Sequence, residues 1–196
     1  KDRLYTAAPR SRARRSAQTA LWRLTWALVR LVAPILVFTT EEVWDHLAKP
    51  AGAPESVHLA LFPEPGELTE GLDERHRERA RNWDRLLEVR DAVLKRLEEA
   101  RQEKAIGAPL EARVHLRADG DLYPLLAEYI EKLPEFFIVS QVSLEQRPGE
   151  FEVVVERASG RKCERCWKYS TEVGADPAWP TICPACAEAV TEILKG

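Results

Sequence analysis

The first part of the chain carries apolar residues at helical spacing. Over residues 11–33 they fall on one stripe of about 100° on a helical wheel. The stripe consists of Ala17, Ala20, Leu21, Leu24, Leu28 and Leu31. Nearly opposite lie Arg12, Arg15, Arg23 and Arg30. Trp26 lies within this arginine arc and Trp22 at its edge. The pattern predicts an amphipathic helix that ends or bends before Pro34, because proline disfavours helical geometry in the residue before it.

Two further helices are predicted before the pattern changes. Thr39 and Glu42 have the spacing of a capping box, which predicts that a second helix opens there. Residues 49–71 contain four prolines and are expected to form a long connection. A charged helix follows over residues 73–104, and Gly107 and Pro109 end it. Its expected core-facing stripe consists of Trp83, Leu86, Leu87, Arg90, Val93, Leu94 and Leu97.

The period of the pattern changes from helical to alternating near residue 110. Residues 110–117 alternate apolar and polar, which predicts a half-buried strand. A short helix at 122–132 and strands at 136–144 and 151–155 are predicted after it. The expected fold is mainly α with a small α+β part: a helical bundle over residues 1–106, an α+β connector over 107–158 and a zinc-ribbon-like module over 159–196.

Composition and charge narrow the class of protein. With 45% hydrophobic and 31% charged residues, the chain is expected to be a soluble globular protein. It has no apolar run of the roughly 20 residues that a membrane span needs. The net charge of -3 conceals two basic regions, within residues 1–40 and 157–168. They indicate localised contact with a polyanion, although ion pairing of the thermophile kind is an alternative for the first. Because the chain starts at Lys1 and contains no Met, we expect an internal fragment.

The four cysteines are spaced as two C-x2-C pairs. They are Cys163, Cys166, Cys183 and Cys186, with 16 residues between the pairs. Two residues between cysteines let a tight turn present both sulfurs to one metal, and two such turns complete a tetrahedron. Four thiolates leave no open position, so the predicted site holds one structural Zn2+. Disulfides, a redox-active pair and an iron–sulfur cluster are the competing interpretations.

The first cysteine pair lies among basic and aromatic residues. Cations that meet phosphates and rings that stack on unpaired bases suit single-stranded nucleic acid. Alternatively, the aromatic residues cover the metal. We expect one of Trp167 and Tyr169 to be buried and the other to be accessible.

Several runs together resemble one known family, and they occur in its order along essentially the whole chain. KDRLY at 1–5, RRSAQT at 14–19, API at 33–35 and FTTEEVW at 38–44 resemble the anticodon-binding helical domain of bacterial isoleucyl-tRNA synthetases. VRDAVL at 89–94 with IG at 106–107 matches that family's long helix and its exit. CERCW at 163–167 and CPAC at 183–186 resemble its C-terminal zinc module, which related synthetases for valine and leucine do not share. A similar zinc finger closes certain DNA glycosylases, but they lack the helical part.

The resemblance implies the C-terminal part of an isoleucine–tRNA ligase, lacking the first helices of the bundle. Its role would be to hold the anticodon stem-loop of tRNA(Ile) while ATP-dependent aminoacylation proceeds in other domains. HIGH-like, KMSKS-like and glycine-rich phosphate-loop motifs are absent, and the four histidines are scattered, so we expect no catalysis here. Partners are expected to be tRNA and the remaining domains of the same synthetase, in a monomeric, cytoplasmic protein.

The expected RNA contacts come from two places. On the first helix they are Arg12, Arg15, Arg23, Arg30 and Trp26, although this face is an alternative packing surface for missing helices. In the zinc module they are Lys162, Arg165, Trp167 and Lys168. Two alternatives stay open: a stand-alone zinc protein that binds nucleic acid, and a zinc module that is only a structural clasp.

Overall fold

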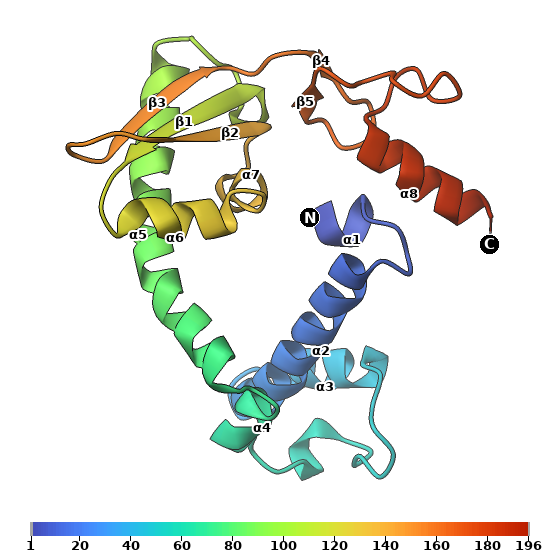
Figure 1. Cartoon of the computed structure of the whole chain (residues 1–196). Helices are drawn as coiled ribbons and strands as arrows, with labels where there is room; N and C mark the ends of the chain where they lie inside the picture. The colour runs from blue at the N-terminus through green and yellow to red at the C-terminus, as the bar shows by residue number, and fades with distance from the viewer. Residues whose placement is uncertain (1, 196) are drawn as a thin grey trace. The chain divides into compact units, whose positions relative to one another are not determined.

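The computed structural model describes residues 2–195, which form two compact units (Figure 1). Pro9–Asp73 forms one, called here the helical unit. The residues up to Ala8 together with those from Glu74 onward form the other, called the sheet unit. None of the helices within residues 2–195 is long and apolar enough to cross a bilayer.

The helical unit contains four helical segments. They are α2 (Arg12–Val32), α3 (Val37–His46), the 3-10 turn η1 (Val57–Leu59) and α4 (Pro65–Thr69). Ser11 caps α2, because its side chain accepts a hydrogen bond from the Arg14 N–H at 3.3 Å. The predicted first helix is therefore confirmed nearly residue for residue.

The capping box predicted at Thr39 and Glu42 is wrong. Both residues lie inside α3, which begins at Val37. The neighbouring Thr40 is buried, and its hydroxyl donates to the Leu36 carbonyl at 2.9 Å inside the helix instead of capping it. The connection expected over residues 49–71 also contains two short helical segments, η1 and α4, although it is rich in proline.

Tryptophans, not leucines, lie inside the helical unit. The buried residues of its hydrophobic core cluster are Val29, Ala33, Trp44 and Val57. Trp26 stacks on Trp44 with ring centroids 4.6 Å apart, and Trp22 stacks on Trp26 at 5.8 Å. The leucine stripe of α2 faces outward, with 47% to 57% of each side chain exposed at Leu21, Leu24, Leu28 and Leu31.

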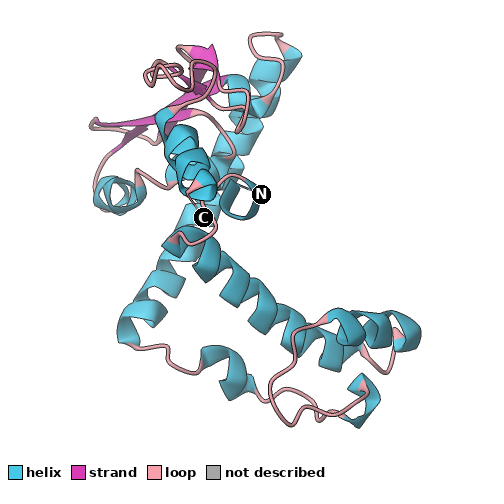
Figure 2. Ribbon diagram, turned by 90° about the vertical axis from the view of Figure 1, so that its right-hand side faces the viewer, coloured by secondary structure: helices cyan, strands magenta, loops and turns pink. Residues whose placement is uncertain are grey.

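The sheet unit is built on one long helix and three strands. Its elements as far as Arg157 are α1 (Asp2–Tyr5), α5 (Glu74–Gln102), the 3-10 turn η2 (Pro109–Glu111), β1 (Ala112–Ala118), α6 (Leu122–Tyr129), α7 (Leu133–Phe137), β2 (Gln141–Gln146) and β3 (Glu152–Arg157). The strand order is β2-β1-β3, with β1 parallel to β2 and antiparallel to β3. In Figure 2 the strands, drawn in magenta, lie beside the upper part of α5.

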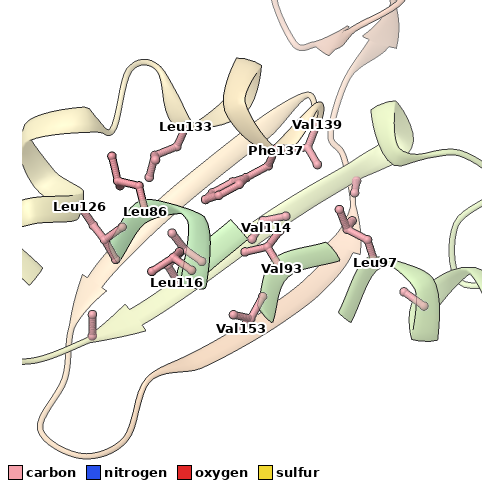
Figure 3. Close-up of a cluster of buried hydrophobic side chains, with 14 of the residues drawn as sticks. Leu86, Val93, Leu97, Val114, Leu116, Leu126, Leu133, Phe137, Val139 and Val153 are labelled. Atoms are coloured by element: carbon pink, nitrogen blue, oxygen red, sulfur yellow. The ribbon is translucent and has the colours of Figure 1, made fainter. Parts of the chain in front are cut away.

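One core joins α5 to the sheet. Leu86, Val93 and Leu97 of α5 pack against the alternating buried residues of β1, Ala112 to Ala118 (Figure 3). Leu126, Leu133 and Phe137 from α6 and α7 complete this core. Trp83 and Leu87, which were expected on the core-facing stripe, are 45% and 46% exposed.

Two expectations about the sheet unit need correction. The strand predicted over residues 136–144 begins only at Gln141, because α7 extends to Phe137 and Ile138 ends it in a left-handed conformation. The boundary expected at 106/107 falls inside the sheet unit, since α5 packs on the sheet. By its contacts, the chain divides between Asp73 and Glu74.

Candidate metal centre and nucleic-acid interface

Two short strands and one helix position the four cysteines. The strands β4 (Arg161–Lys162) and β5 (Tyr169–Ser170) pair antiparallel, with Cys163 and Cys166 in the turn between them. The Cys163 N–H donates to the Lys168 carbonyl and the Trp167 N–H to the Cys163 carbonyl, both at 2.9 Å. These bonds close the turn, which is called here the knuckle (residues 161–170).

The second cysteine pair lies at the start of a helix. Cys183 is the N-cap of α8 (Pro184–Leu194), and Cys186 lies in its first turn. Pro184 occupies the first helical position, where its fixed φ suits a helix and its missing N–H costs nothing. The C-P-x-C sequence therefore folds locally into a helix start that presents both sulfurs.

Gly160 allows the chain to enter the knuckle. Its φ is +92°, and a Cβ placed there would lie 2.2 Å from the carbonyl carbon of Ser170. Any other residue would clash with backbone, which cannot move aside.

The four sulfurs gather at one point. Their Sγ atoms all lie within 4.8 Å of one another, and the Cys166 and Cys183 sulfurs are 3.9 Å apart. Tetrahedral zinc with Zn–S bonds of about 2.3 Å requires sulfurs roughly 3.8 Å apart. All four cysteines are free thiols, and Cys163 and Cys186 are buried. The donor set and its size fit a closed, structural zinc site.

The surroundings of the sulfurs shift their protonation in opposite directions. Burial raises the pKa of Cys163, but the backbone N–H groups of Cys166, Cys183 and Arg165 outweigh it and lower that pKa to about 6. Burial raises the pKa of Cys186 to about 11, against the opposing hydrogen bond from Arg165. Burial also raises the pKa of Cys166, well above its ordinary value. One sulfur is thus prepared as a thiolate at neutral pH, and zinc would displace the protons that remain on the others.

The aromatic residue that lies against the cysteines is Trp179. It packs on a small core formed by Cys163, Val173, Ile182, Cys186 and Ala187. Only Trp167 and Tyr169 were expected to cover the metal. The sequence Trp179-Pro180, which lies shortly before the second cysteine pair, could have indicated that Trp179 packs there.

The knuckle presents part of the predicted RNA-binding set. Trp167 is 51% exposed, and the Lys162 ammonium lies 5.7 Å from its ring centroid. Lys168 follows directly and is half-buried, as is Tyr169. Lys162 and Trp167 therefore form a basic and aromatic pair on the surface of the knuckle.

Arg165 does not face outward with this pair. Its guanidinium donates to the Thr6 carbonyl at 2.5 Å and approaches the Cys186 sulfur at 3.7 Å. The RNA contact by Arg165 stays a prediction, although the hydrogen bond from its Nη1 atom lies inside the sheet unit.

The predicted basic face of α2 divides into two parts. Arg12, Arg15 and Arg23 are exposed, and Arg23 approaches the Glu70 carbonyl at 3.4 Å. Arg30 is only 9% exposed and pairs with Glu67 at 2.5 Å. Its guanidinium also lies 5.1 Å from the Trp26 ring centroid, and Trp26 stacks on both Trp22 and Trp44. Arg30 and Trp26 therefore pack inside the helical unit and leave the predicted RNA-contacting face.

A cross-strand set of polar residues on the sheet was not predicted. Ser143 lies 2.5 Å from His115 Nδ1, and Glu156 lies 3.1 Å from His115 Nε2. The same face holds Arg117, which pairs with Glu145 and Glu152. Only strand register brings these residues together, so no sequence pattern indicates that they meet. They act as cross-strand pairs on the polar face of the sheet.

Two family models match this chain. Residues 1–116 match the anticodon-binding domain of tRNA ligase. Residues 160–189 match the zinc finger found in FPG and IleRS, which covers all four cysteines. The second match agrees with the thiolate geometry and supports zinc as the metal.

Curated relatives are similar to this chain over nearly its whole length. Isoleucine–tRNA ligase of Carboxydothermus hydrogenoformans is 50% identical over 98% of this chain, which corresponds to 21% of that protein. The ligase of Symbiobacterium thermophilum is 46% identical over 98% of the chain and 22% of its own length. The ligase of Thermotoga maritima is 42% identical over 100% of the chain and 21% of its length. The chain thus spans about a fifth of the length of these relatives. On the family match over residues 1–116 and the zinc finger that follows, the chain belongs to the anticodon-binding domain family of tRNA ligases.

Proposed function

We propose that this chain is the part of an isoleucine–tRNA ligase that binds the anticodon region of tRNA(Ile). ATP-dependent aminoacylation would take place in other domains of the same protein, as the names and lengths of the relatives suggest. The single observation that carries the RNA contact is the exposed Trp167 beside Lys162 on the metal-bound knuckle.

The backbone of Trp167 supports this role. Its φ is +67°, a region that costs a bulky residue on the order of 1–3 kcal/mol. The closed knuckle holds it there, since the Trp167 N–H is bonded to the Cys163 carbonyl at 2.9 Å. A large, half-exposed aromatic residue held in a strained position suits a preformed stacking surface for an unpaired base.

The chemistry fits a single-stranded loop of RNA. Stacking of a base on an aromatic side chain contributes about 1–3 kcal/mol. Lys162 and Lys168 would meet neighbouring phosphates, and the exposed Arg12, Arg15 and Arg23 of α2 would supply further phosphate contacts.

Competition binding tests the choice of partner. Labelled, unmodified tRNA(Ile) is bound to the zinc-loaded chain and displaced by unlabelled tRNA(Ile), an unrelated tRNA or duplex DNA. We expect tRNA(Ile) to compete at least about tenfold better than either of the others, a difference of about 1.4 kcal/mol. Equal competition by all three would favour a general nucleic-acid-binding zinc protein.

Single substitutions test the knuckle. Trp167→Ala should weaken tRNA binding about five- to 150-fold, which corresponds to the loss of about 1–3 kcal/mol of stacking. Lys162→Ala should weaken it less and reduce the salt dependence by about one phosphate contact. Phe38→Ala removes an aromatic side chain that is 88% exposed in the helical unit and serves as the matched control.

A structural clasp is the second candidate, and specific contacts favour it. The Tyr169 N–H donates to Ser140 Oγ at 2.7 Å, and Gln141 exchanges hydrogen bonds with Ser159 at 2.9 and 3.0 Å. These bonds hold the cysteine module (residues 159–194) against the three-stranded sheet, and they need no RNA. Unchanged tRNA binding by Trp167→Ala, with zinc retained, would favour the clasp over the RNA contact.

A further inference from the structure

The first residues of the chain pack on the sheet unit, although the chain leaves that unit directly after them. Ala8, the last residue before the helical unit, is 8% exposed. Arg3 pairs with Glu135 of α7 at 3.4 Å, but both side chains are more than 40% exposed. An exposed pair of this kind contributes only about 0–1 kcal/mol, so another contact must hold this segment (residues 2–8).

Arg165 supplies a contact to the backbone of this segment. Its Nη1 atom donates to the Thr6 carbonyl at 2.5 Å and lies 3.7 Å from the Cys186 sulfur. One nitrogen of Arg165 thus contacts both a predicted zinc ligand and the backbone of Thr6, which lies 159 positions before Arg165 in the chain.

The knuckle fixes where this guanidinium lies. Arg165 lies between Cys163 and Cys166, and the Glu164 N–H before it donates to the Thr181 carbonyl at 3.1 Å. With zinc bound, Cys186 is a thiolate, and a hydrogen bond from a cation to an ionised acceptor is roughly twice as strong as a neutral one. Without zinc, the turn loses the bonds that hold its two cysteines together, and the position of Arg165 is no longer fixed.

We propose that Arg165 is a positioning residue that couples zinc binding to the docking of residues 2–8 on the sheet unit. Zinc fixes the conformation of the knuckle, and the knuckle fixes the position of the Arg165 side chain. Arg165 in turn donates a hydrogen bond to the Thr6 carbonyl. The start of the connection into the helical unit is therefore fixed by the metal site. This inference needs no RNA contact and goes beyond the proposed function.

Backbone dynamics test the coupling, measured on the zinc-loaded chain without RNA. In the wild type, the amide order parameters of residues 4–8 should be near the rigid value of about 0.85. Arg165→Met should keep one zinc per chain and lower them below about 0.6. Lys162→Met removes a positive charge from the same knuckle and should leave them unchanged. Rigid residues 4–8 in zinc-loaded Arg165→Met would overturn the proposal.

Zinc removal provides a second test that needs no substitution at Arg165. A chelator should mobilise residues 4–8 of the wild type, and added zinc should restore their order. If these residues stay rigid without zinc, the coupling does not exist. Arg3→Met should leave residues 5–8 ordered, and their release by that variant would place the anchor at Glu135 instead.

Discussion

At the scale of single residues, Arg30 shows how a charged side chain becomes part of an interior. Its Nη2 atom lies 2.5 Å from Glu67, its Nε donates to the Trp26 carbonyl at 3.0 Å, and its guanidinium carbon lies 5.1 Å from the Trp26 ring centroid. The hydrogen bond from Arg30, followed by that from the Glu64 N–H, lowers the pKa of Glu67 below its ordinary value of 4.5. The pair therefore links the stability of the helical unit to pH.

The sign of this link follows from the direction of the shift. Because the folded pKa is the lower one, the contribution of Glu67 is complete above pH 4.5 and is lost as the pH falls through the folded value. Glu67→Gln should lower the free energy of unfolding by about 1 kcal/mol at pH 7, a modest value because Glu67 is partly exposed. The difference from wild type should shrink toward zero as the pH falls through the lowered pKa of Glu67 in the folded chain.

Urea unfolding, followed by the near-ultraviolet circular dichroism of the stacked tryptophans, measures this difference. Glu55→Gln is the matched control, since it neutralises an exposed carboxylate of the same unit outside the contact of Arg30 with Glu67. A Glu67→Gln effect of the same size at pH 3 and pH 7 would contradict the assignment to the ionised pair.

The sequence predicted the surroundings of some residues better than those of others, and the difference has a physical reason. The cysteine spacing fixed the metal ligands, because only local turns are needed to bring each pair together. The helical wheel of α2 gave its two faces but not which face turns inward. The stack of Trp22, Trp26 and Trp44 determines which face turns inward. This stack depends on Trp44 of α3, which follows Trp26 by 18 residues in the chain. Arg30 was misassigned for the same reason, since Glu67 is distant in sequence.

At the scale of elements, α5 changes its surroundings along its length. Every residue from Glu74 to Arg81 is exposed, whereas Leu86, Val89, Val93, Leu97 and Ala100 are buried against the sheet. The periodic pattern predicted the helix and both of its ends to within two residues. It could not reveal that the second half belongs to the sheet, because a helical stripe does not identify its partner.

Two adjacent leucines of α5 test this assignment. Leu86 is 1% exposed and Leu87 is 46% exposed, on the same turn of the same helix. Leu86→Ala should destabilise the sheet unit by about 2–5 kcal/mol through lost burial and a cavity. Leu87→Ala should change its stability by no more than about 0.5 kcal/mol. Native-state hydrogen exchange of the β1 amides reports both values, and comparable losses would show that the helix face is misassigned.

Short elements were predicted less well than long ones. The turn from α7 into β2 depends on Ile138, which takes a φ of +60° between Phe137 and Val139, both fully buried. Tertiary burial of these neighbours overrides the reluctance of a β-branched residue to adopt that φ. A sequence pattern does not show which neighbours are buried in the folded chain. The start of β2 was therefore predicted at residue 136, before its observed start at Gln141.

At the scale of the whole molecule, the described residues 2–195 contain three separate hydrophobic clusters of buried residues. One lies in the helical unit, one joins α5 to the three strands, and one surrounds the cysteines. The last contains only Cys163, Val173, Ile182, Cys186 and Ala187 as buried residues. Such a small core cannot offset the conformational entropy of its segment without further cross-links. We infer that the metal supplies most of the folding free energy of this module, as structural zinc does in zinc fingers.

Removing zinc should therefore unfold one region and spare the other two. With a chelator, the amide resonances of residues 161–194 should collapse toward random-coil positions, while those of β1–β3 and α2 keep their dispersion. Far-ultraviolet circular dichroism should lose only the contribution of α8, a helix of 11 residues. Cys163→Ser should give the same spectrum without a chelator, because three thiolates hold the metal far less tightly. Melting of the sheet together with the cysteine module would mean that the two cores are not independent. A folded module without metal would mean that the cysteines are not what stabilises it.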